Sequence, residues 1–153
     1  MNETRNEMTK ILIVEDDMII GANISLQLTN LGYEVTGIVS RGEEAVAQVK
    51  DYAPDILLMD INLKGKLNGI ETAKAIQKSN DIPLVYLTAN ADEATFVKAR
   101  ETHPHAFISK PFNALDLQRT IALVAERLKD KSGVKIKEEN PVEVLNDRVF
   151  VRH

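Results

Sequence analysis

Short apolar runs recur along residues 10 to about 130, and they lack the alternation with polar residues that marks a half-exposed strand. Ile11–Val14 and Ile56–Met59 are the clearest examples. Strands that are buried on both faces, as in parallel sheets between two layers of helices, have this pattern. Between the runs, apolar residues are spaced by three or four positions, which indicates amphipathic helices. The alternation therefore predicts an α/β, doubly wound fold with a five-stranded parallel sheet.

The limits of the predicted elements follow from the same pattern and from the residues that interrupt it. Strands are predicted at 11–14, 33–39, 55–59, 83–88 and 105–109, and helices at about 20–31, 45–49, 70–79, 91–101 and from 113 onward. Asp17 is predicted to cap the first helix, because a side-chain oxygen there can accept a bond from a free backbone N–H. Ser40 and Glu43 have the spacing of a capping box for the second helix.

Length and composition restrict the class of protein. The 153 residues suffice for one domain with a hydrophobic core, and the net charge of −4 gives no reason to expect nucleic-acid binding by this segment. Without cysteine, the chain has neither disulfides nor thiol catalysis. No apolar run approaches the ~18 residues of a membrane span. We expect a cytoplasmic protein away from the membrane, with a flexible or disordered N-terminus at 1–9, one domain at 10–131 and a linker or tail at 132–153.

Reactive side chains stand at the ends of four predicted strands. Glu15 and Asp16 follow the first strand, Asp60 closes the third, Thr88 closes the fourth, and Lys110 follows the fifth. Open α/β sheets bind their ligands beyond the carboxyl ends of the strands. Acids after a strand can also serve only to cap the next helix. Because an ammonium and a third carboxylate are expected beside them, we interpret the group as a site.

The chemistry of such a group favours a divalent cation and phosphate. Neighbouring carboxylates cannot all ionise at low cost, and Mg²⁺ relieves their repulsion while it also binds phosphate oxygens. The backbone carbonyl of Asn62 is close enough in sequence to Asp60 to be a further metal ligand. A carboxylate held in this way can attack phosphorus, and Lys110 can neutralise charge on the transferred group. The hydroxyl of Thr88 can donate to a phosphoryl oxygen.

Four short motifs at these strand ends resemble those of the receiver domain of two-component response regulators. They are Val14-Glu15-Asp16-Asp17, Met59-Asp60, Leu87-Thr88-Ala89 and Ser109-Lys110-Pro111-Phe112, in that order along the chain. The resemblance covers residue 10 to about 130. It implies the flavodoxin-like (βα)5 receiver fold with strand order 2-1-3-4-5, and a cis peptide bond between Lys110 and Pro111.

The resemblance also implies a role for the residues around the phosphoryl group. Asp60 would be the phosphoacceptor for a sensor histidine kinase or a phosphotransfer protein, and Thr88 and Lys110 would contact the phosphoryl group. Thr88 and Phe107 would be the switch residues. Phe107 would act by packing alone, because it lacks the hydroxyl of the tyrosine that is frequent in the family.

A metal ion and an interface are implied in the same way. The implied ligands of Mg²⁺ or Mn²⁺ are Glu15, Asp16, Asp60 and the backbone carbonyl of Asn62. Glu15 stands where aspartate is commoner, which lengthens the reach to the metal. Several receivers dimerise through the face that corresponds to residues 91–130, so a phosphorylation-linked homodimer through this face is expected.

Two other classes of site can also use a carboxylate at a strand end. Phosphohydrolases with an aspartyl nucleophile usually carry it after the first strand with a second acid two residues later, whereas Asp60 follows the third strand and Asn62 comes two residues later. Flavin- or nucleotide-binding modules need a phosphate loop rich in Ser, Thr and Gly, whereas Glu15-Asp16-Asp17 repels phosphate unless a metal intervenes. We therefore expect a signalling switch with only intrinsic self-phosphorylation and autodephosphorylation, not a conventional enzyme.

The sequence leaves the output of the switch open. Residues 145–153 resemble the start of a LytTR-type DNA-binding domain, which would make transcription the output. The alternative is a stand-alone receiver that docks onto protein partners.

Overall fold

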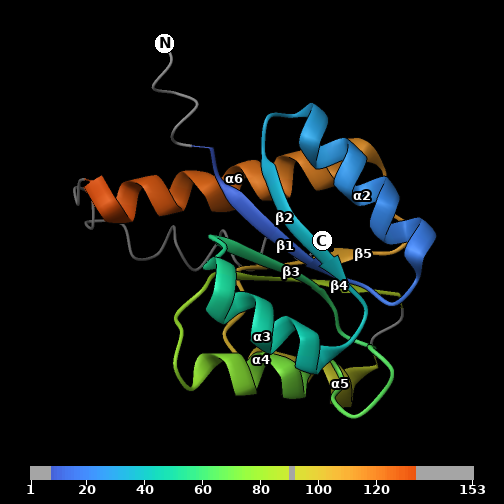
Figure 1. The fold of residues 1–153 in the computed structure, drawn as a ribbon. Coiled ribbons are helices and arrows are strands. Elements are labelled where there is room, and N and C mark those ends of the chain that lie inside the picture. Colours follow the sequence, from blue (N-terminus) through green and yellow to red (C-terminus); the bar gives the residue numbers. More distant parts are fainter. Residues whose placement is uncertain (1–7, 90–91, 134–153) are drawn as a thin grey trace.

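The computed structural model describes residues 8–89 and 92–133, which form a five-stranded parallel sheet with helices on both sides (Figure 1). The strands are β1 (Lys10–Val14), β2 (Glu34–Val39), β3 (Ile56–Asp60), β4 (Leu84–Thr88) and β5 (Ala106–Ser109). The helices are α2 (Met18–Asn30), α3 (Gly42–Tyr52), α4 (Gly69–Gln77), α5 (Glu93–Arg100) and α6 (Ala114–Gly133). The strand order β2-β1-β3-β4-β5 confirms the predicted doubly wound, flavodoxin-like fold.

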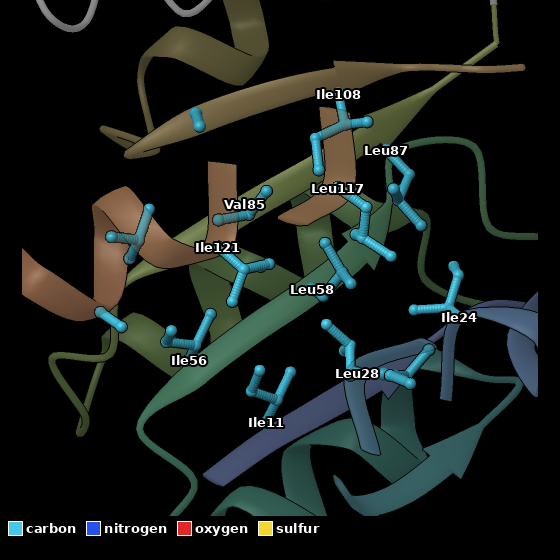
Figure 2. Close-up of a cluster of buried hydrophobic side chains, with 14 residues drawn as sticks. Ile11, Ile24, Leu28, Ile56, Leu58, Val85, Leu87, Ile108, Leu117 and Ile121 are labelled. Atoms are coloured by element: carbon cyan, nitrogen blue, oxygen red, sulfur yellow. The ribbon is translucent and has the colours of Figure 1, made fainter. Parts of the chain in front are cut away.

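The two faces of the sheet carry separate hydrophobic cores. Helices α2 and α6 lie on one face, and α3, α4 and α5 lie on the other (Figure 1). Figure 2 shows the first core, in which Ile11 and Leu58 of the sheet pack with Ile24 of α2 and Leu117 of α6. Burial of these side chains on the sheet fixes the positions of both helices.

The second core explains why the central strands are continuous apolar runs up to their ends. Leu12 and Met59, which are sequence neighbours of residues in the first core, pack instead with Val49 of α3 and Ile76 of α4. Successive side chains of a strand point to opposite faces, so a strand between two helical layers is apolar throughout. The continuous apolar runs therefore have the cause that the sequence pattern indicated.

The helix caps confirm one sequence prediction and correct another. Asp17 caps α2, and its Oδ1 accepts hydrogen bonds from the N–H groups of Ile19 and Ile20 at 3.0 and 3.2 Å. The predicted capping box of Ser40 and Glu43 is wrong. Helix α3 begins later than that box requires, so the N-cap residue is Arg41, which makes no side-chain capping bond.

A capping box that the sequence analysis missed lies at the start of α4. Asn68 Oδ1 accepts from the Glu71 N–H at 2.8 Å, and Glu71 Oε1 accepts from the Asn68 N–H at 2.9 Å. This reciprocal pair ends the loop after β3 at a fixed point and so supports the edge of the sheet where Asp60 lies.

The predicted boundary at residue 131 falls inside α6, which extends to Gly133. The hypothesis of a LytTR-like segment at 145–153 lies outside the described residues, as do most of the predicted N-terminal segment and most of the tail. Within the described ranges, no helix combines the length and apolar character needed to span a bilayer.

Gly69, the first residue of α4, lies against the backbone at the end of β3. A Cβ at this position would press on the carbonyl oxygen of Asp60 and lie 2.7 Å from Cα of Ile61. Because backbone cannot move aside as a side chain can, we expect Gly69→Ala to lower the free energy of unfolding by about 3 kcal/mol, measured by urea denaturation. The shift of this loop should also disturb Asp60.

Gly21 in α2 offers a matched control for this substitution. A Cβ at Gly21 would meet the Cγ2 methyl of Ile38, at 2.9 Å, which is a side-chain atom and not backbone, and the gain in helix propensity offsets part of that crowding. We expect Gly21→Ala to change the free energy of unfolding by less than about 1 kcal/mol. Equal effects of the two substitutions would contradict the assignment of Gly69 as a site of close backbone approach.

Candidate functional site

A cleft of about 670 Å³ opens at the carboxyl edge of the sheet, beyond the ends of β1, β2, β3 and β5. The residues around it are Glu15, Asp16, Asp17, Ile20, Ser40, Arg41, Asp60, Asn62, Lys64, Gly65 and Lys110. Five of the predicted site residues, namely Glu15, Asp16, Asp60, Asn62 and Lys110, therefore share one cleft. Thr88 and Phe107 are not among the residues that line it.

Lys110 forms an ion pair with each of two buried carboxylates at the floor of the cleft. Its Nζ lies 2.8 Å from Glu15 Oε1 and 3.3 Å from Asp60 Oδ2. The exposed fraction is 1% for Glu15 and 5% for Asp60, so both carboxylates are largely removed from water. The cis peptide bond between Lys110 and Pro111, implied by the resemblance, is present. One ammonium thus neutralises part of the charge of two acids.

Backbone groups orient the same two carboxylates. Glu15 Oε2 accepts from the N–H of Asp17 at 3.0 Å, and Asp60 Oδ1 accepts from the N–H of Asn62 at 2.9 Å. The predicted role of Asn62 was that of a carbonyl ligand to a metal. In the structure Asn62 borders the cleft, and its N–H orients the Asp60 carboxylate.

Burial sets the electrostatics of the pair formed by Glu15 and Lys110. Burial raises the pKa of the Glu15 carboxyl, and the nearby charge of Asp60 adds to this, while hydrogen bonding to Lys110 and to the Asp17 N–H partly opposes it. For Lys110, burial alone would lower the pKa. Its hydrogen bond to Glu15 and the charges of Asp60 and Glu15 outweigh burial, so the pKa lies above the ordinary value and the ammonium stays charged.

The donor set of the cleft fits a hard divalent cation. One carboxylate oxygen from each of Glu15, Asp16 and Asp60 lies within 4.8 Å of the other two. Asp16 is held beside the loop after β3 by a hydrogen bond of 3.3 Å from the N–H of Lys64. Oxygen donors in this number, with open solvent on one side for further waters, are typical of magnesium sites.

Thr88 and Phe107 lie on neighbouring strands next to this group. The Oγ1 of Thr88 is buried and makes no hydrogen bond within the described part of the chain. The backbone carbonyl of Thr88 accepts from the N–H of Lys110 at 2.8 Å. The half-buried ring of Phe107 packs against Tyr86 and Phe96, with ring centroids 5.7 and 4.8 Å apart. Phe107 therefore joins the sheet to α5, whereas Thr88 retains a free donor.

The sequence analysis missed Ser40 and Arg41 as residues of the cleft. Both follow the carboxyl end of β2, so the rule that located Glu15, Asp60 and Lys110 applies to them as well. The assignment of Ser40 to a capping box concealed this position. Arg41 adds a cation to the exposed rim of the cleft.

Comparisons with known proteins agree with this geometry. The response regulator receiver domain family matches residues 11–122. The transcriptional regulatory protein PdtaR of Mycobacterium tuberculosis is 30% identical over 143 residues, which make up 94% of this chain and 67% of PdtaR. The DNA-binding response regulator MtrA of Mycolicibacterium smegmatis is 29% identical over 137 residues, or 90% of this chain and 55% of MtrA.

A solved structure gives the same result for the fold. The signal receiver domain of a modulated diguanylate cyclase from Desulfovibrio desulfuricans G20 superposes with a TM-score of 0.76 at 37% identity, over 81% of this chain and 98% of that domain. The family match covers most of the chain, and the site residues stand at the strand ends where the motifs predicted them. The chain therefore belongs to the response regulator receiver domain family, as the receiver domain of a two-component response regulator.

Proposed function

We propose that Asp60 accepts a phosphoryl group from a sensor histidine kinase or a phosphotransfer protein, in a reaction that depends on Mg²⁺ or Mn²⁺. One observation carries the proposal: the Asp60 carboxylate ends β3 in an open cleft, 3.3 Å from the Lys110 ammonium and beside two further acids. An acid that served only as a helix cap or an ion-pair partner would need no such cleft and no second carboxylate around the same ammonium.

Asp60, Lys110 and Asn62 each have a distinct part in the transfer. An oxygen of Asp60 attacks phosphorus, the new O–P bond forms, and the bond from phosphorus to the donor nitrogen breaks as that nitrogen takes up a proton. Lys110, already charged and in contact with Asp60, neutralises charge on the phosphoryl oxygens. The N–H of Asn62 keeps the carboxylate oriented towards the cleft.

Glu15, Asp16 and Asp60 would hold the metal ion, with the Asn62 carbonyl as the further ligand proposed from the sequence. The ion, when bound, supplies positive charge to the phosphoryl oxygens. Glu15 also holds Lys110 in position through the 2.8 Å contact. Glu15 would therefore both bind the metal ion and orient the Lys110 ammonium.

We propose that Thr88 and Phe107 convert phosphorylation into a change of shape. The buried Thr88 hydroxyl has no hydrogen-bond partner among the described residues, and a phosphoryl oxygen on Asp60 would provide one. Movement of Thr88 towards that oxygen would alter the space beside Tyr86, two residues earlier on β4, against which Phe107 packs. Because Phe107 also packs against Phe96, the change would reach α5.

The test of the proposed function is direct phosphorylation of the purified chain. Incubation with acetyl phosphate and Mg²⁺ should add the mass of one phosphoryl group, and removal of the metal with EDTA should prevent the gain. Peptide mapping should locate the group on Asp60. Absence of an adduct with either Mg²⁺ or Mn²⁺ would refute the proposal.

Helix α2 carries the features expected of the surface that receives the phosphoryl donor protein. Its 13 residues include no charged side chain, and it exposes Met18, Ile19 and Leu26 to solvent. Ile20 of the same helix lines the cleft. A protein that brings its phosphohistidine to Asp60 would therefore cover the start of α2.

Ile19, which is 81% exposed, offers a test of this surface. We expect Ile19→Gln to slow transfer from the cognate phosphohistidine protein about tenfold, because burial of an isoleucine contributes about 1.5 to 3 kcal/mol. The rate with acetyl phosphate should not change. Leu123→Gln on α6, another exposed apolar residue, is the matched control and should leave both rates unaltered. A loss with both donors would argue against a docking role.

The remaining parts of the proposal concern the output. The names of PdtaR and MtrA describe a transcriptional regulator and a DNA-binding response regulator, and we propose control of transcription as the output. The alternative is a stand-alone receiver that docks onto proteins.

We also propose that the chain acts in the cytoplasm as a switch without turnover of a separate substrate. Phosphorylation would promote a homodimer through residues 91–130. Light scattering with and without a phosphoryl mimic tests the dimer.

A further inference from the structure

The rim of the cleft carries positive charge on the side formed by the loops after β2 and β3. Arg41 and Lys64 are exposed and line this side, whereas the buried carboxylates of Glu15 and Asp60 form the floor. Arg41 reaches across to the other loop, because its Nη1 would lie 3.1 Å from a Cβ placed on Gly65. A leaving group that moves from Asp60 towards solvent on this side would pass the Arg41 guanidinium.

Within residues 8–89 and 92–133, the Arg41 guanidinium forms neither an ion pair nor a helix-capping bond. Arg41 occupies the N-cap position of α3 without a side-chain capping bond. None of the ion pairs between described residues includes it, although Glu43 and Glu44 lie in the first turn of the same helix. Glu44 Oε1 instead accepts from the N–H of Ser40 at 3.3 Å. The Arg41 side chain is therefore available to a ligand in the cleft.

We propose that Arg41 is a specificity-determining residue that favours acyl phosphates among small phosphodonors, by binding the carboxylate that leaves as Asp60 accepts the phosphoryl group. The inference rests on the proposed function of Asp60. In the step, the bond between phosphorus and the acyl oxygen breaks, its electron pair stays on that oxygen, and a carboxylate departs. An arginine fork binds a carboxylate through two parallel N–H donors, so the contact strengthens as negative charge develops.

Phosphoramidate is a phosphodonor whose leaving group carries no negative charge. Its P–N bond breaks as the nitrogen takes up a proton, and the leaving group is neutral ammonia. Arg41 has no anion to bind on the leaving side in this reaction. The general attraction of a cation for either anionic donor is a separate effect, which removal of a charge from the neighbouring loop measures. Lys66 serves for that purpose, because it is exposed on the loop after β3 but does not line the cleft.

The test compares Arg41→Gln and Lys66→Gln with the unaltered chain, using acetyl phosphate and phosphoramidate with Mg²⁺, and intact mass as the readout of rate. We expect Arg41→Gln to lower the second-order rate constant about tenfold for acetyl phosphate, the size of one charge-assisted contact, and less than about twofold for phosphoramidate. Lys66→Gln should change both rates equally and slightly. Arg41→Lys, which keeps the charge but loses the fork, should recover only part of the loss.

The outcomes separate this inference from the function on which it rests. Equal losses with both donors, or no loss with acetyl phosphate, would overturn the role of Arg41 while Asp60 remained the acceptor. Failure of the unaltered chain to accept a phosphoryl group from either donor would refute the proposed function itself. Thermal unfolding of each variant verifies that the fold is intact.

Discussion

Asp60→Asn should abolish the phosphoryl adduct with every donor while it leaves the fold intact. The amide oxygen of asparagine can still accept the hydrogen bond that Asp60 Oδ1 receives from the N–H of Asn62. Lys110 keeps its closer partner, Glu15, at 2.8 Å. The substitution removes the nucleophilic oxygen and a metal ligand together, so no residual rate is expected. Intact mass after incubation with acetyl phosphate and Mg²⁺ measures the loss.

The matched control is Asp55→Asn, at the residue just before the start of the same strand. Asp55 is exposed, and its Oδ2 accepts from the N–H of Lys10 at 2.8 Å, away from the cleft. The control makes the same chemical change within five positions of Asp60 and should retain the full adduct. An adduct that persists in Asp60→Asn would mean that another group is the acceptor, and peptide mapping would identify it.

Most of the fold was predictable because its local signals agree with its packing. The continuous apolar runs require helices on both faces, and the two cores built around Leu12 and Leu58 have that arrangement. The cap of α2 by Asp17 was also readable, because the residue directly precedes the helical pattern. The capping box predicted at Ser40 was wrong because such a spacing is compatible with several helix starts. Only tertiary packing determines where α3 begins.

Sequence reasoning located the floor of the site better than its rim. Glu15, Asp60 and Lys110 stand at strand ends, and the topology of a parallel sheet brings strand ends together without further information. The reach of Arg41 to Gly65 depends on the shapes of two loops, which the pattern of apolar residues does not specify. The contacts of Phe107 likewise depend on which aromatic residues α5 and β4 present to it.

Lys110→Met is expected to have the second largest effect, on stability as well as on transfer. Loss of the ammonium leaves the buried carboxylates of Glu15 and Asp60 facing each other without a cation, which costs about 3 kcal/mol when a buried ion pair is broken. The rate of phosphorylation should fall about a hundredfold, because no side chain then neutralises the phosphoryl oxygens. Urea denaturation without metal at pH 8 measures the first effect, and intact mass measures the second.

The pH dependence identifies charge as the cause of the lost stability. Burial already raises the pKa of Glu15 above its ordinary value of 4.5, and contact with Lys110 opposes that rise, so removal of Lys110 should raise the pKa further. A carboxyl with a higher pKa in the folded chain binds more protons there than in the unfolded chain, so stability falls as pH rises above 4.5 towards the folded pKa. The deficit of Lys110→Met should therefore shrink at acidic pH.

Two further variants separate unpaired charge from lost packing in Lys110→Met. Lys74→Met breaks an exposed ion pair with Glu101 at 3.6 Å and should cost less than about 1 kcal/mol. Addition of Glu15→Gln to Lys110→Met removes one of the two unpaired carboxylates and should restore most of the stability, because the burial of charge is then smaller. If the double variant is as unstable as Lys110→Met alone, the methylene groups of Lys110 stabilise the fold by packing, and its ammonium serves only the transfer.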